Sequence, residues 1–148
     1  MRKQEKIASF TRVINRCIIA LVAVLIPCLP AVIRWFCQYR PMTLAEQTAV
    51  TVSFYCCSAV IFTALWNMDR LLGSIVAGQV FILENVRRIR RIQWCCGIVS
   101  LICVPASFAY MPLIFLVVIM AFLCLCVGVL SCVMDAAVAI REENDLTI

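Results

Sequence analysis

Long runs of apolar residues, separated by short polar segments, dominate the pattern of this chain. A helix rises about 1.5 Å per residue, so about 20 apolar residues cross a hydrocarbon core of about 30 Å. Four runs reach this length, from about Val13 to Phe36, Gln47 to Trp66, Ile92 to Tyr110 and Leu113 to Met134. The pattern therefore predicts an all-α integral membrane protein with four transmembrane helices.

Turn and capping signals extend these runs into helices and set their order. We expect helices over about 13–36, 44–68, 86–110 and 113–140, a loop over about 69–91 and a tail over 141–148. Thr43, with Glu46 three residues later, matches the capping box that satisfies the first amides of a helix. Short connections predict two antiparallel hairpins in one four-helix bundle domain. Within the first hairpin, Arg34 and Glu46 are expected to approach each other.

Lysine and arginine residues are distributed unevenly among the connecting segments. They gather before the first expected helix, between the second and third, and after the fourth, whereas Arg34 and Arg40 fall on the other side. Basic residues concentrate on the cytoplasmic side of a membrane. Both termini and the middle loop are therefore predicted to be cytoplasmic. Aromatic residues, which favour the interfaces, agree, because Trp66 and Trp94 lie at inner helix ends and Trp35 at an outer one.

Cysteine content raises the question of disulfides or a metal site, since the chain has 11 cysteines but no histidine. Nearly all of these cysteines lie inside the apolar runs, where a thiol behaves as a small apolar side chain. Two pairs of cysteines are adjacent in sequence, Cys56 with Cys57 and Cys95 with Cys96. Adjacent side chains point about 100° apart on a helix, so neither pair resembles two ligands of one metal ion. We expect structural packing, with no metal and no cofactor.

Small residues recur every four positions in the last apolar run, at Cys124, Gly128, Cys132 and Ala136. Such a ridge lets a second helix approach closely in lipid. We expect this contact within the monomer, and a homo-oligomer is the alternative.

The segment 78–92 combines an apolar face with arginines on another face, which predicts a short amphipathic cytoplasmic helix at the membrane surface between helices two and three. Glu84 stands four residues before Arg88, the spacing of a helical ion pair. The surface binds either anionic lipid, at about 1 kcal/mol for each arginine, or an acidic partner. Its candidate contact residues are Glu84, Asn85, Arg87, Arg88, Arg90 and Arg91.

The C-terminal tail carries three acidic side chains, Glu142, Glu143 and Asp145, and faces the same compartment as the arginines. These acidic residues are also candidate contacts. In one alternative, the acidic residues fold back towards the arginines when no partner is bound. In the other, they are solvated and the arginines bind anionic lipid.

These two motifs carry a family resemblance. The run from Phe81 to Arg91, followed by Trp94, and the ending over 141–148 resemble an uncharacterised family of bacterial membrane proteins, domain of unknown function 2975. The resemblance implies a bacterial cell membrane, no established activity, and a gene beside a small Cro-like helix-turn-helix regulator, which is a candidate partner. Similar proteins usually carry Ser or Thr, a helix N-cap, where this chain has Ile82.

Catalysis is the weakest functional reading, because the chain has no histidine, no nucleophile beside a base and no paired carboxylates within its spans. Transport would need ionisable residues inside the spans, but Arg34, Asp69 and Asp135 fall near helix ends. We therefore expect a multi-pass interaction or regulatory protein that is not an enzyme. It tethers or senses a cytoplasmic partner, such as the helix-turn-helix regulator, without contacting nucleic acid itself. The alternative is an oligomeric small-molecule or peptide transporter or an immunity-type membrane protein.

Overall fold

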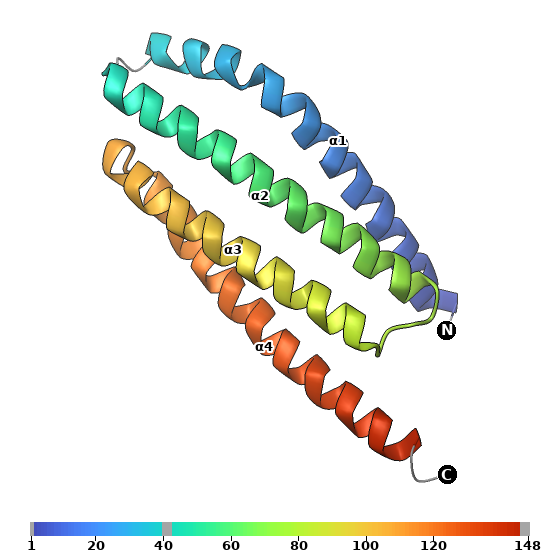
Figure 1. Cartoon of the computed structure of the whole chain (residues 1–148). Helices are drawn as coiled ribbons and strands as arrows, with labels where there is room; N and C mark the ends of the chain where they lie inside the picture. The colour runs from blue at the N-terminus through green and yellow to red at the C-terminus, as the bar shows by residue number, and fades with distance from the viewer. Residues whose placement is uncertain (1, 40–42, 146–148) are drawn as a thin grey trace.

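The computed structural model describes residues 2–39 and 43–145, apart from the side chains of residues 2–6, 37, 39, 109, 142, 144 and 145. Its helices are α1 (Arg2–Tyr39), α2 (Leu44–Val76), α3 (Leu83–Ala109) and α4 (Leu113–Asp145) (Figure 1). The described ranges contain no strand. Each helix includes a stretch long and apolar enough to cross a membrane. This confirms the predicted all-helical chain with four apolar helices.

The helices lie side by side in the order of the chain. α1 packs on α2, α2 on α3 and α3 on α4, and in the described part of the chain no other pair of helices has Cα atoms within 8 Å. The helices therefore form an open row, which is a less compact arrangement than the expected four-helix bundle. Lipid tails are as apolar as the helices, so nothing drives a helix to bury all its sides against protein.

α2 begins as the sequence predicts. The Thr43 hydroxyl accepts a hydrogen bond from the Glu46 amide at 3.4 Å, and the Glu46 carboxylate accepts one from the Thr43 amide at 3.0 Å. The predicted capping box and the start at Leu44 are confirmed. Among the described side chains, no ion pair joins Arg34 to Glu46, because the Glu46 carboxylate already binds the start of its own helix.

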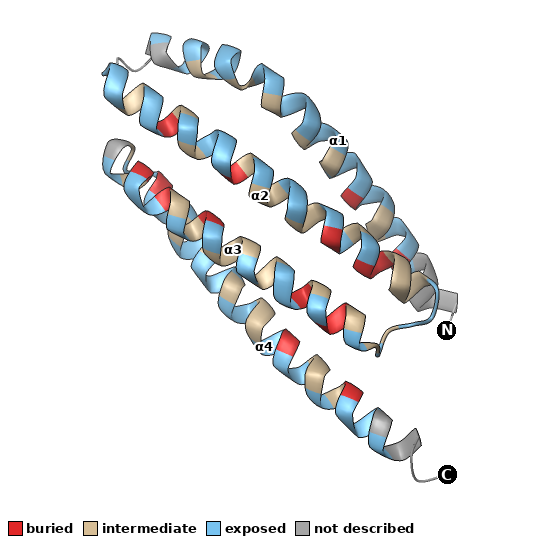
Figure 2. Ribbon diagram, viewed as in Figure 1, coloured by how far each residue is buried: buried red, intermediate tan, exposed pale blue. Residues whose placement is uncertain are grey.

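The amphipathic segment predicted between helices two and three is helical but is not a separate surface helix, because it forms the first turns of α3. α2 continues to Val76, residues 77–82 connect it to α3, and the segment starting at Leu83 forms the first turns of a helix unbroken to Ala109. Its apolar face is divided, since Val86 is 2% and Ile89 5% exposed, whereas Leu83 is 51% exposed. Figure 2 shows buried positions near the start of α3. The loop expected over 69–91 is correspondingly short.

The molecule has two ends with different chemistry. The start of α1, the connection 77–82 and the last turns of α4 are at the same end of the row, and the end of α1 and the turn 110–112 are at the other (Figure 1). We call these the charged end and the turn end. The described side chains that name the charged end are Arg12, Arg16, Asp69, Arg70, Arg87, Arg88, Arg90, Arg91 and Asp135.

Close packing between α3 and α4 uses the predicted small residues. A Cβ atom at Gly128 would lie 2.7 Å from Gln93 Nε2, and one at Gly97 would lie 3.5 Å from Cys124 Sγ. This half of the ridge therefore packs within the monomer. Further along α4, Cys132 is exposed.

The buried core lies where α2, α3 and α4 meet. Cys57, Val99 and Cys103 are buried together, and Met120 of α4 packs against them. The two thiol sulfurs are 3.7 Å apart. Cysteine thus supplies small, soft side chains to a core between helices.

Candidate interaction site at the charged end

Asp69 joins α1 to α2 at the charged end. Its carboxylate accepts hydrogen bonds from Arg12 Nε at 3.4 Å and from Arg16 Nε at 3.2 Å. Beside them, the buried Asn15 donates to the carbonyl of Leu65 at 3.2 Å. The two arginines are one helical turn apart, so they approach the same carboxylate from one face of α1.

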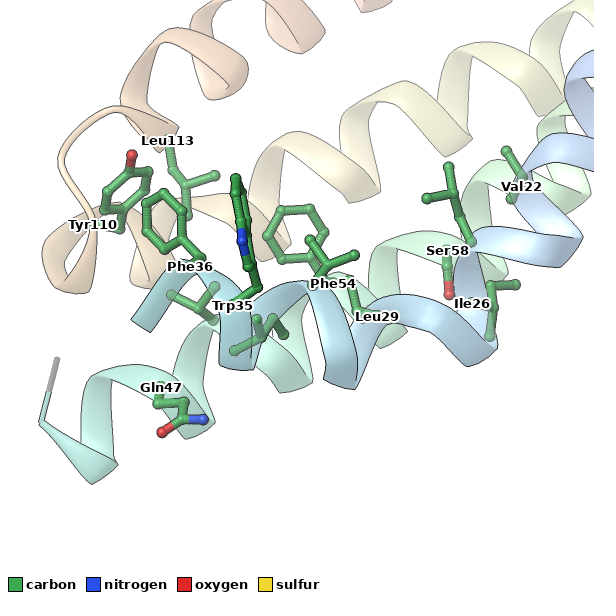
Figure 3. A pocket seen from close by; sticks show the side chains of 14 residues that line it. Val22, Ile26, Leu29, Trp35, Phe36, Gln47, Phe54, Ser58, Tyr110 and Leu113 are labelled. Atoms are coloured by element: carbon green, nitrogen blue, oxygen red, sulfur yellow. The ribbon is translucent and has the colours of Figure 1, made fainter. Parts of the chain in front are cut away.

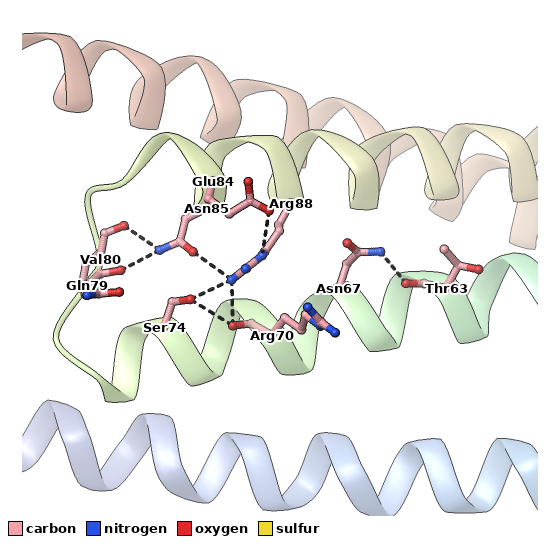
Figure 4. Close-up of polar contacts among 9 residues, drawn as sticks. All are labelled: Thr63, Asn67, Arg70, Ser74, Gln79, Val80, Glu84, Asn85 and Arg88. Carbon is pink, nitrogen blue, oxygen red and sulfur yellow. Dashed lines mark hydrogen bonds and ion pairs between the residues drawn. The ribbon is translucent and has the colours of Figure 1, made fainter.

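Arg88 joins α3 to α2. Its guanidinium donates to the carbonyl of Arg70 at 3.1 Å and to the Ser74 hydroxyl at 2.7 Å (Figure 4). Its Nε also lies 3.5 Å from Glu84, which confirms the ion pair predicted from their spacing. The Arg88 side chain is only 15% exposed. Arg88 is therefore a structural residue that binds a neighbouring helix.

Asn85 holds the connection before α3 in place. It is fully buried, and its Nδ2 donates to the carbonyls of Gln79 at 2.7 Å and Val80 at 3.0 Å (Figure 4). Ile82, at the N-cap, makes no side-chain cap hydrogen bond. The amide of Asn85 therefore organises the start of this helix where a capping hydroxyl is lacking.

Arg90 joins α3 to α4. Its Nη2 lies 2.7 Å from Asp135 Oδ2, and both side chains are partly exposed. Each neighbouring pair of helices in the row is thus connected by at least one arginine at the charged end. These contacts give the charged end a defined geometry.

Arg87 and Arg91 differ from the other arginines of this segment. Both are exposed, one turn apart on α3, and neither forms an ion pair with a described residue. The exposed side chains of Phe81 and Leu83 lie just before them in the chain. The six candidate residues of this segment therefore divide into four with structural contacts and two that offer free guanidinium groups to the surroundings.

The structure describes only part of the acidic tail, which in one predicted alternative folds back towards the arginines. α4 is helical to Asp145, and Glu143 is exposed. The side chains of Glu142 and Asp145 lie outside the described residues.

Asp69 and Asp135 are contact residues of the charged end that the sequence pattern did not reveal, because both are expected to be solvated at helix ends. Each is an isolated acidic residue near the end of an apolar run. That isolation was the available signal. No group of three or more cysteine or acidic side chains suited to a metal ion occurs among the described residues.

A comparison with known protein families shows which family the chain belongs to. The family model described as "Protein of unknown function (DUF2975)" matches residues 17–148. The chain belongs to this family. No curated protein and no solved structure matches it.

The DUF2975 match confirms the resemblance inferred from the middle segment and the tail. It covers α2, α3 and α4 completely, including Asp69, Arg88, Arg90 and Asp135. Arg12 and Arg16 precede the matched range. Within this DUF2975 chain, the contacts between α2, α3 and α4 therefore lie entirely inside the family region.

Proposed function

We propose that this DUF2975 protein is a multi-pass protein of the bacterial cell membrane that binds an acidic cytoplasmic partner at its charged end. The exposed pair Arg87 and Arg91 is the observation that carries the proposal. Arg12, Arg16, Arg88 and Arg90 form ion pairs within the fold, and the guanidinium of Arg70 lies over the ring of Trp66, 5.7 Å from its centroid. Two uncompensated charges one turn apart therefore remain for an external carboxylate or phosphate, the ligands that guanidinium groups bind best.

The charged end extends beyond the membrane interface. Trp66 marks the interface on α2, and the helix continues to Val76, which is about 15 Å further at 1.5 Å per residue. α3 likewise begins at Leu83, well before Trp94. A protein partner can thus reach the arginines without entering lipid, and the positive-inside rule places them in the cytoplasm.

The partner that best fits this surface is a small protein with an acidic patch, and the helix-turn-helix regulator implied by the family resemblance is the first candidate. The exposed Phe81 and Leu83 add apolar contact area beside the charges. The ion pairs of Asp69, Arg88 and Arg90 hold this surface in one geometry, which lowers the entropy lost on binding.

Affinity capture from native membranes in mild detergent tests the proposal. The double variant Arg87→Glu with Arg91→Glu is expected to lose the captured cytoplasmic partner, because it reverses the charges that face it. Arg34→Glu is the matched control, since Arg34 is also an exposed arginine but lies towards the turn end of α1. If the double variant captures the partner as well as the wild type while losing only anionic phospholipid, the arginines are a lipid anchor and the proposal is wrong.

Orientation is tested separately. A cysteine introduced at Gln79, which is exposed in the connection of the charged end, should escape an impermeant thiol reagent in intact cells. One at Gln38, exposed at the end of α1, should react. The reverse pattern would place the charged end outside.

A further inference from the structure

An apolar groove opens between α1 and α2 at the turn end. Its volume is about 450 Å³, and its walls come mainly from α1 and α2, with Tyr110 from the turn before α4 and Leu113 from the start of α4 (Figure 3). α1 contains Pro27 and Pro30 in this region and curves along its length (Figure 1). Proline removes a backbone hydrogen bond and bends a helix, which separates α1 from α2 here.

The groove has the dimensions of a single hydrocarbon chain. It extends along α1 from Val22 to Phe36, about 20 Å at 1.5 Å per residue. A volume of 450 Å³ divided by this length gives a mean cross-section of about 20 Å². A helix about 10 Å across needs roughly 80 Å². These dimensions favour a single extended hydrocarbon chain as the occupant, and the experiment below tests a second copy of the protein as the alternative.

The lining changes from apolar to amphipathic along the groove. Its deep part, around Leu29 and Phe54, is apolar, whereas Trp35, Tyr110 and Gln47 lie at the turn end (Figure 3). The rings of Phe36 and Tyr110 contact each other edge to face there, with centroids 5.9 Å apart. Trp and Tyr mark the headgroup level of a bilayer, so the groove runs from that level towards the midplane.

We propose that this groove binds one acyl chain of a phospholipid from the outer leaflet. This rests on the membrane placement of the proposed function but not on partner capture. The hydrocarbon of one leaflet is roughly 15 Å thick, half of a core of about 30 Å. The groove, at about 20 Å, is therefore long enough to hold an acyl chain of that leaflet. Arg34 does not line the groove, but it is exposed and lies between the lining residues Ile33 and Trp35 in sequence, so α1 carries a cation near the headgroup level that Trp35 marks.

Native mass spectrometry of the full chain, extracted from membranes into mild detergent and then washed, tests this inference. The wild type is expected to retain one phospholipid per chain. Leu29→Trp, which fills the groove with an indole, is expected to lose it. The matched control is Leu125→Trp, which makes the same change at an exposed site of α4 outside the groove.

A second groove variant guards against a folding defect. Ser58→Trp fills the opposite wall of the groove, and helicity by circular dichroism verifies that both variants are folded. Retention of the lipid by folded Leu29→Trp and Ser58→Trp overturns the inference, as does a folded wild type without lipid. A wild-type dimer that Leu29→Trp converts to a monomer also overturns it, because a second chain would then fill the groove. None of these three results changes partner capture, which depends on Arg87 and Arg91.

Discussion

Replacing Asp69 by asparagine should weaken the attachment of α1 to α2 more than any other single removal of charge at the charged end. The carboxylate is 19% exposed and serves two arginines, at 3.4 and 3.2 Å. A hydrogen bond to a charged group contributes about 1.5–3 kcal/mol when sheltered, and an exposed ion pair contributes at most about 1 kcal/mol. Arg12 and Arg16 are 35% and 62% exposed, so we expect a loss of about 1–2 kcal/mol in the free energy of unfolding.

Asp135→Asn is the matched control for this prediction. Its ion pair with Arg90 is shorter, at 2.7 Å, but the two side chains are 42% and 58% exposed and the carboxylate has one arginine partner. We therefore expect a loss of less than about 1 kcal/mol. Reversible unfolding in mixed micelles, with a denaturing detergent as titrant, measures both. If Asp135→Asn lowers the free energy of unfolding as much as Asp69→Asn does, the strength of these ion pairs depends on distance. It would then not depend on exposure and on the number of partners, and the reasoning would be wrong.

A double-mutant cycle isolates the interaction itself. The free-energy changes of Asp69→Asn, Arg16→Gln and the double variant should differ from additivity, because the two residues share one contact. Additive changes would show that Arg16 contributes nothing through Asp69.

Three further changes probe the helix junctions. Asn85→Ala should cost about 1–3 kcal/mol, because two carbonyls including that of Gln79 lose their donor; denaturant unfolding that is unchanged would contradict this. Gly128→Leu should separate α3 from α4 and lower Tm, since even a Cβ meets Gln93 at 2.7 Å; an unaltered Tm would show that Gln93 simply moves aside. Ile82→Ser should raise stability by about 0.5–1 kcal/mol by supplying the missing N-cap, and a lower Tm would mean that the half-buried isoleucine contributes more than the cap.

Local signals predicted local structure well. The apolar runs gave four helices, and Thr43 with Glu46 placed the start of α2, because both features depend only on residues close in sequence. The ion pair between Glu84 and Arg88 followed from spacing for the same reason.

The contacts between helices could not be predicted from the sequence pattern. The pairing of Asp69 with Arg12 and Arg16 depends on the rotation of α1 against α2, which no local signal sets. The amphipathic pattern before Trp94 fits a helix lying on lipid as well as one packed on protein. Only the position of α2 shows that Val86 faces protein.

Because the helices lie in a row in chain order, the protein can assemble while it is being synthesised. A nascent chain emerges from the ribosome N-terminus first, so α1 enters the membrane before α2, and α2 before α3. Each new helix packs against the helix that precedes it in the chain, which is already in place. A closed bundle would instead leave one side of α1 unpaired until α4 had been inserted. The open row removes that delay, during which a waiting surface could associate with other chains.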